Sequence, residues 1–172
     1  ELIDFTIEFF IQNSKKKLII RTHPGEFLGN VPTSYSIENY ITNKFGSLPE
    51  NIKLVNSFSK LNTYKIAKHC DLAIVYSSKM SIEFASLGLP VVCCGEAWVK
   101  NKKITFDPKN KKDYIKYLNM NLKRAKIIQK RKKNKALQFA YFYFFKKMIK
   151  INLIKKFNYK YPRYFSNIHS FK

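Results

Sequence analysis

The stretch from Asp71 to Gly95 constrains the fold of this chain more than any other part of the sequence. It reads DLAIVYSSKMSIEFASLGLPVVCCG, in which two apolar runs, 72–76 and 89–94, enclose an apolar-rich segment over 79–87. Apolar runs without polar alternation are typical of strands buried on both faces, in parallel sheets that helices cover. We therefore predict a strand, a helix and a second, parallel strand in this order.

The same alternation of strands and helices extends toward the N-terminus. Short apolar runs predict strands near residues 18–22, 52–56, 72–76 and 90–94. Apolar-periodic segments predict helices over residues 1–13, 35–45, 61–70 and 79–87. Alternating elements joined by right-handed crossovers predict an α/β fold with a doubly wound, Rossmann-like parallel sheet. We expect one further edge strand at 104–106.

The C-terminal part of the chain has a helical and basic pattern. A long helical stretch is expected from residue 110 or 111 to about 138, with the polar cluster Gln129–Lys135 interrupting its apolar stripe. The segment Ala136–Phe145 is apolar and aromatic. We predict three parts: a Rossmann-like domain over 1–112, C-terminal helices over 113–156, and a basic, aromatic tail over 157–172 that we expect to be ordered only in part.

The ends of the chain and its cysteines bear on its surroundings. Glu1 already lies inside the first helical pattern, so we expect a piece of a longer protein. No apolar run reaches the roughly 18 residues of a membrane-spanning helix. Cys70, Cys93 and Cys94 are odd in number, so we expect no disulfide framework and a reducing compartment. We predict a cytoplasmic protein, with peripheral contact at the inner face of the cytoplasmic membrane as an open alternative.

Metal and nicotinamide sites lack sequence support. His23, His69 and His169 have no partner Cys or His at zinc-ligand spacing, so we expect no metal site. No GxGxxG follows a predicted strand, which argues against a dinucleotide-binding Rossmann site. We expect no cofactor.

The positive charge is concentrated in the C-terminal half. Residues 1–98 carry 10 basic and 9 acidic side chains, whereas residues 99–172 carry 23 and 2. This basic half, with its interleaved aromatic residues, makes a nucleic-acid-binding module an alternative function. However, Arg residues are scarce, RNP-like, KH and zinc-finger patterns are absent, and AT-rich coding also favours lysine. We therefore expect no nucleic-acid partner.

Polar residues gather at the carboxyl ends of the predicted strands, where parallel sheets bind ligands. Ser77 and Ser78 precede the helix over 79–87, so they either cap it or bind a phosphate at its positive end. Glu83 lies one turn further, and either pairs with Lys79 or binds ribose hydroxyls. His23 ends the first strand as a donor to phosphate or sugar oxygens, or bonds to the backbone. We expect these residues to converge at one sheet edge.

Three segments carry a resemblance to a known family. RTHPGE, NIKLV and YKIAKHCDLAIVYSSKMSIEFASLGLPVVCCGEAWVKNKKITFDP resemble bacterial capsule polysaccharide biosynthesis proteins, over about residues 18–110. They are similar to the C-terminal, nucleotide-sugar-binding half of a GT-B glycosyltransferase. ALQFAYFYFF resembles the aromatic C-terminal helix of the same proteins. Looser similarity extends to CDP-glycerol glycerophosphotransferases and UDP-N-acetylglucosamine 2-epimerases, which are alternative functions; an epimerase needs acid and base residues that the sequence does not identify.

The resemblance implies roles for particular residues. It assigns His23 to the donor phosphate, Ser77 and Ser78 to the diphosphate, and Glu83 to the ribose. Lys79 stands where such proteins often have a small residue, and would either add charge at the phosphate or crowd it.

The resemblance also implies partners. Gly95 and Glu96, with Trp98 nearby, would flank the base or the sugar. The catalytic base of the N-terminal half has no counterpart here, so donor binding without transfer is expected of this chain alone. The implied partners are a nucleotide-sugar donor and a polysaccharide or lipid-linked acceptor. For Ala136–Phe145 two burials stay open: packing on an absent domain, or lying on an anionic membrane, where flanking lysines would attract the lipid headgroups.

Overall fold

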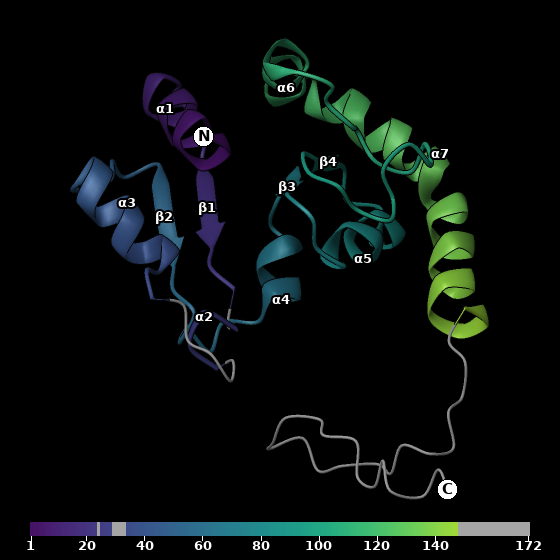
Figure 1. Cartoon of the computed structure of the whole chain (residues 1–172). Helices are drawn as coiled ribbons and strands as arrows, with labels where there is room; N and C mark the ends of the chain where they lie inside the picture. The colour runs from purple at the N-terminus through teal and green to yellow at the C-terminus, as the bar shows by residue number, and fades with distance from the viewer. Residues whose placement is uncertain (24, 29–33, 148–172) are drawn as a thin grey trace, which may run out of the picture. The chain divides into compact units, whose positions relative to one another are not determined.

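The computed structural model describes residues 1–23, 25–28 and 34–147 (Figure 1). The described residues divide into two compact units, the first up to Thr63 and the second over 64–147. The predicted tail over 157–172, and the part of the predicted helical region beyond residue 147, lie outside the described residues.

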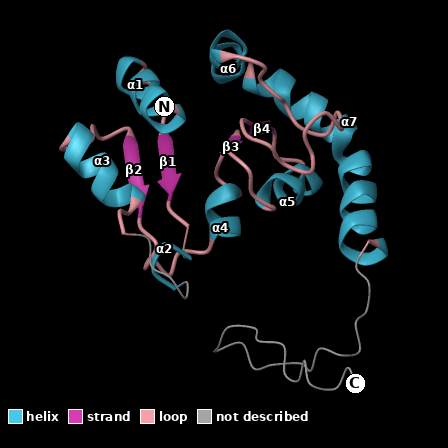
Figure 2. Ribbon diagram, viewed as in Figure 1, coloured by secondary structure: helices cyan, strands magenta, loops and turns pink. Residues whose placement is uncertain are grey.

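Helices and strands alternate in both units, as Figure 2 shows. The elements up to the junction are α1 (Leu2–Gln12), β1 (Leu18–Arg21), α2 (Gly25–Leu28), α3 (Ile37–Phe45), β2 (Ile52–Val55) and α4 (Thr63–Ala67). The second unit continues with β3 (Ala73–Val75), α5 (Met80–Leu87), β4 (Val91–Cys93), α6 (Lys111–Leu118), α7 (Leu122–Tyr141) and the π-helical turn η1 (Phe142–Lys146). All four predicted strands are confirmed, each with slightly tighter bounds.

The first unit is built on the parallel pair β1 and β2, in which Leu18 is opposite Ile52. Ile7 of α1 is fully buried, because the apolar face of this helix turns inward. Asn51 ties the elements together: its side-chain amide donates hydrogen bonds of 2.9 Å to the carbonyls of Phe10 and Lys16. The end of α1 is thereby fixed next to the start of β2.

The second unit is built on the parallel pair β3 and β4, in which Val75 is opposite Cys93. All three residues of β4 are buried, as its unbroken apolar run predicts. The predicted edge strand at 104–106 is reduced to one parallel bridge between Val92 and Phe106. Two hydrogen bonds make this bridge, from Cys93 N–H to the Phe106 carbonyl (2.9 Å) and from Phe106 N–H to the Val91 carbonyl (2.8 Å).

The fold is therefore mixed α/β with short parallel sheets. The described strands form two two-stranded sheets, β1 with β2 and β3 with β4. A continuous doubly wound sheet is not present among these strands, which are only three or four residues long. Strand identity follows from local apolar runs, whereas the joining of strands depends on contacts that local patterns do not encode.

The helical stretch predicted from residue 110 or 111 to about 138 consists of two helices, α6 and α7. The Asn121 side chain accepts a hydrogen bond of 3.0 Å from the backbone N–H of Arg124 and so starts α7. Within α7 the polar cluster 129–135 causes no break. Gln129 is fully buried there, and its amide donates to the Ala85 carbonyl of α5 at 3.2 Å. Figure 1 shows α5 lying against α7.

The aromatic segment 136–145 packs on its own unit. Neither of the two predicted modes of burial, against an absent domain or on a membrane, included this packing. Ala136 is fully buried, and Phe139 and Tyr143 pack against the core that contains Ile82, Cys93 and Val99. Residues on the other side of the same segment, Leu137, Tyr141 and Phe145, remain exposed. Among the helices of the described residues, none is long and apolar enough to cross a membrane.

Candidate functional site

The candidate site lies in the second unit, where β3 ends and α5 begins. Residues 76–79 connect the two elements. The side chains of Ser77 and Lys79 are exposed, and Ser78 is half-buried. This connection is at the carboxyl end of a parallel strand, which is the edge where α/β sheets bind ligands.

Ser78 accepts hydrogen bonds from the first residues of α5. Its hydroxyl oxygen accepts a hydrogen bond of 3.2 Å from the backbone N–H of Met80. Its carbonyl accepts the backbone N–H and the hydroxyl of Ser81, at 3.0 and 2.7 Å. The N–H groups of residues 82 and 83 donate to the Lys79 carbonyl. Of the two predicted roles of Ser78, helix cap or phosphate ligand, these bonds support the cap. The backbone N–H groups of residues 80–83 already have acceptors within the chain.

The donor groups next to Ser78 have no hydrogen-bond partner among the described residues. The Ser77 hydroxyl and the Lys79 ammonium make no hydrogen bond or ion pair with another described residue, and neither do the backbone N–H groups of residues 77–79. A hydroxyl, an ammonium and three successive N–H groups form a short run of donors. Successive backbone N–H groups in a turn are a common arrangement for anions.

Glu83 is held by a residue that the sequence did not identify. The Tyr64 hydroxyl donates a hydrogen bond of 2.7 Å to Glu83 Oε2. The same ring packs edge-on against Phe84, with centroids 6.5 Å apart. No ion pair joins Glu83 to Lys79 among the described residues, so that predicted pairing is wrong. Glu83 is half-buried and can still accept hydrogen bonds from a ligand through its second oxygen.

Gly95 brings the ends of β3 and β4 together. Its N–H donates to the Tyr76 carbonyl at 2.8 Å. A Cβ atom on Gly95 would lie 2.7 Å from that carbonyl oxygen, which is too close for any other residue without backbone movement. Gly95 therefore lies against the residue that precedes Ser77.

The turn after Gly95 continues into charged and aromatic side chains. Glu96 forms an ion pair of 2.5 Å with Lys100, four residues further along the chain, which raises the pKa of Lys100. The half-exposed ring of Trp98 stacks on Tyr143, with centroids 4.2 Å apart and planes inclined by 25°. Trp98 thus anchors the helical C-terminal segment.

His23 lies in the first unit, beyond the carboxyl end of β1. Thr22 before it is buried, and its N–H donates to the Val55 carbonyl at 3.1 Å. His23 itself is exposed, and its Nδ1 accepts a hydrogen bond of 2.9 Å from the Gly25 N–H. In the neutral ring the proton is therefore on Nε2, which can donate to a phosphate or sugar oxygen. His23 follows β1 and Ser77 follows β3, which belong to different two-stranded sheets. The convergence of these residues at one sheet edge therefore stays a prediction.

The cysteines near this site have the features of unreactive thiols. All three are free thiols. Burial raises the pKa of the Cys94 thiol to about 12 and also raises the pKa of Cys93. A nucleophile needs the thiolate form, so neither residue is suited to covalent catalysis.

The arrangement in the second unit offers hydrogen-bonding groups to a ligand. It offers donors for an anion at residues 77–79 and an acceptor for hydroxyl groups at Glu83. The described residues contain no group of three or more His, Cys, Asp or Glu side chains that could hold a metal ion. Sequence reasoning missed Tyr64, whose only signal was its place on the helix before β3.

Comparison with known proteins adds no relative. No protein-family model matches this chain, and neither a curated protein nor a solved structure matches it significantly.

Proposed function

We propose that this chain binds a nucleotide-activated sugar as the donor-binding part of a glycosyltransferase of surface polysaccharide biosynthesis. The observation that carries the proposal is a run of hydrogen-bond donors at residues 77–79 that have no acceptor among the described residues. This run lies beyond the carboxyl end of β3. The sequence resemblance to capsule polysaccharide biosynthesis proteins supports it independently. The proposal includes a Rossmann-like, doubly wound arrangement of the four strands, of which the parallel pairings are the part already visible.

The donor would be bound by charge and hydrogen bonds. The Ser77 hydroxyl, the Lys79 ammonium and the N–H groups of residues 77–79 would hold the diphosphate, because each of them can donate to a phosphate oxygen. Glu83 would accept the vicinal ribose hydroxyls, with the Tyr64 hydroxyl fixing the carboxylate rotamer. Gly95 and Glu96 would flank the base or the sugar.

His23 has a separate part in the proposal. Its Nδ1 is bonded to the Gly25 N–H, which leaves Nε2–H as the donor toward a phosphate or sugar oxygen. No described residue of this chain is assigned as the catalytic base, so the proposed activity of this chain is donor binding.

The proposal places the protein in the cytoplasm, in contact with an anionic membrane that carries the acceptor. Leu137, Tyr141 and Phe145 are 45%, 55% and 71% exposed, and Lys146 and Lys147 follow them. Aromatic rings at the headgroup level and adjacent lysines together favour reversible attachment. Flotation with anionic vesicles at low salt, and release in high salt or with neutral vesicles, would support this contact. Equal recovery with neutral and anionic vesicles would contradict it.

Titration calorimetry tests donor binding. A panel of uridine, guanosine and cytidine nucleotide sugars is titrated into the whole chain, its Glu83→Gln and His23→Ala variants, and the control Glu8→Gln on the exposed face of α1. Loss of a charge-assisted hydrogen bond should weaken binding about tenfold or more. The control should bind as the wild type does, and all variants should keep their unfolding temperature. If no nucleotide sugar binds, or if Glu83→Gln and His23→Ala simply unfold, the proposal fails.

A further inference from the structure

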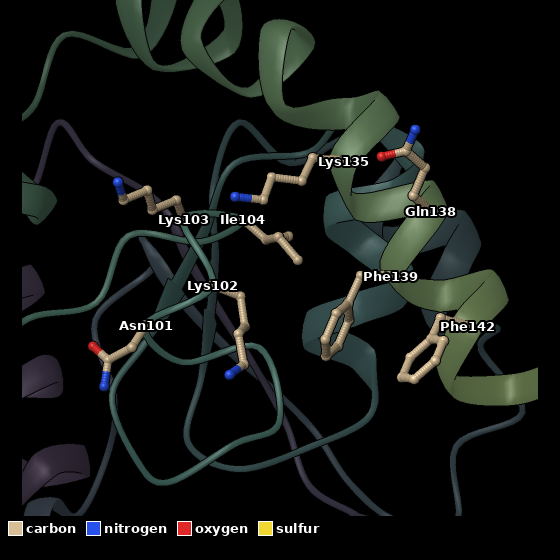
Figure 3. Close-up of a pocket in the computed structure, with 8 residues that line it drawn as sticks. All are labelled: Asn101, Lys102, Lys103, Ile104, Lys135, Gln138, Phe139 and Phe142. Atoms are coloured by element: carbon tan, nitrogen blue, oxygen red, sulfur yellow. The ribbon is translucent and has the colours of Figure 1, made fainter. Parts of the chain in front are cut away.

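A concave surface lies between the loop that follows Val99 and the C-terminal helical segment, α7 and η1 (Figure 3). It is an open hollow of about 480 Å³, within the volume range of small-molecule sites. Eight residues line it: Asn101, Lys102, Lys103, Ile104, Lys135, Gln138, Phe139 and Phe142. Three of these are lysines and none is acidic. We refer to this surface as the lysine–phenylalanine pocket.

The loop side of the pocket has an unusual backbone. Asn101 and Lys103 both have left-handed conformations, with φ of 62° and 59°. Left-handed backbone is uncommon for residues other than glycine, and a lysine there has no local side-chain bond to favour it. Asp107 holds the loop in place, accepting hydrogen bonds from the Asn101 N–H at 2.8 Å and from the Thr105 hydroxyl. The strained backbone presents Lys102 and Lys103 beside the pocket.

The helix side supplies one cation and two rings. Lys135, Phe139 and Phe142 recur at the spacing of one helix face, and Figure 3 shows the Lys135 amine pointing toward the loop that carries Lys103. Phe142 is 51% exposed, and it begins the π-helical turn η1. π-Helical turns are rare and occur often at functional sites.

The pocket lining combines cationic and apolar side chains. Ammonium groups at Lys102, Lys103 and Lys135 attract an anion, and lysine binds phosphate as a point charge without a preferred planar geometry. Ile104 and the phenylalanine rings offer apolar surface to a neighbouring group. Burial of apolar ligand surface on these rings would release water that now contacts them.

We propose that the lysine–phenylalanine pocket binds a phosphate that is joined to an apolar or aromatic body. Two sources have this chemistry, a lipid phosphate and a nucleotide. The inference does not depend on the donor site at residues 77–79, because it rests on different side chains.

The test uses the whole chain and the fluorescent probe 8-anilinonaphthalene-1-sulfonate, which joins one anionic group to aromatic rings. Lys103→Gly, Lys135→Ala and Phe142→Ala should each weaken probe binding about fivefold, since each removes one of the attractions that define the pocket. Lys103→Gly also relieves the left-handed backbone, so it should not lower the unfolding temperature. Lys130→Ala and Phe58→Ala are the matched controls, because both residues are exposed and lie outside the pocket. Glu83→Gln should leave probe binding unchanged.

Displacement of the probe identifies the source of the phosphate. A short-chain phosphatidate below its micelle concentration and a nucleoside diphosphate are each compared with inorganic phosphate. Displacement by either organic phosphate at a concentration at least tenfold below that of inorganic phosphate supports the proposal and names the source. Equal displacement by all three, displacement by none, or pocket variants that bind the probe as the controls do would overturn it.

Discussion

The Tyr64 hydroxyl and the Glu83 carboxylate are joined by a hydrogen bond of 2.7 Å between residues 19 positions apart in the chain. This bond links α4 to the first turn of α5. It also raises the pKa of Tyr64, because a tyrosinate would face the negative charge of Glu83. Glu83 lies one helical turn after Lys79, and its backbone N–H donates to the Lys79 carbonyl at 3.3 Å.

Glu83→Gln should lower the pKa of Tyr64 toward its ordinary value of 10.0. The amide carries no charge, so the main cost of forming the tyrosinate disappears. Ring-carbon NMR signals followed from pH 8 to pH 12 measure this pKa in both proteins. An unchanged Tyr64 titration would show that the hydrogen bond does not form in solution.

Gly95→Ala should destabilise the second unit by about 1–3 kcal/mol, because the new methyl group would meet the Tyr76 carbonyl oxygen at 2.7 Å. Denaturant unfolding measures the change. Ser77→Ala, at an exposed position of the same corner, is the control and should change the free energy of unfolding by less than about 0.5 kcal/mol. A Gly95→Ala variant as stable as this control would contradict the close approach of the two strand ends.

Cys94 should resist alkylation in the folded protein. Its pKa rises from 9.0 to about 12, so at pH 8 its thiolate population falls roughly a thousandfold. Mass spectrometry after treatment with iodoacetamide should find Cys94 unmodified in the native chain and modified in guanidinium chloride. Native alkylation at the rate of a small thiol would be inconsistent with the burial of this residue.

Asp4 should give the first unit a pH dependence in acid. Hydrogen bonds from Tyr40 (2.7 Å) and Lys44 lower the pKa of Asp4 from 3.8 to about 2. A lowered pKa in the folded state stabilises above the unfolded pKa, so this contribution is complete above about pH 5 and is lost as the pH falls toward 2. Tyr40→Phe should raise the pKa of Asp4, as measured by its carboxyl carbon signal. A wild-type Asp4 that titrates near 3.8 would contradict this account.

The strands and α5 could be predicted from the sequence because their signals are local. An unbroken apolar run gives β4, and Gly88, with φ of 89°, ends α5 by accepting the left-handed conformation that the helix end requires. The corner at Ser77 followed from the positions of these elements. Its place between β3 and α5 is confirmed.

The remaining features depend on contacts between distant residues. The break between α6 and α7 had a local signal in Asn119 and Asn121, but the apolar periodicity on both sides concealed it. The buried Gln129 and the Tyr64–Glu83 bond depend on which helices meet, which no single segment encodes. The division of four strands into two sheets has the same origin.

Amide NMR shifts on addition of a nucleotide sugar test the central claim most directly. The proposal predicts saturable shifts at residues 77–79 and at Glu83, with a dissociation constant that Glu83→Gln raises about tenfold. Inorganic phosphate at the same concentration should move the signals of residues 77–79 but not that of Glu83, since it has no ribose. Absence of shifts at residues 77–79, or shifts confined to the residues that line the lysine–phenylalanine pocket, would contradict donor binding at the end of β3.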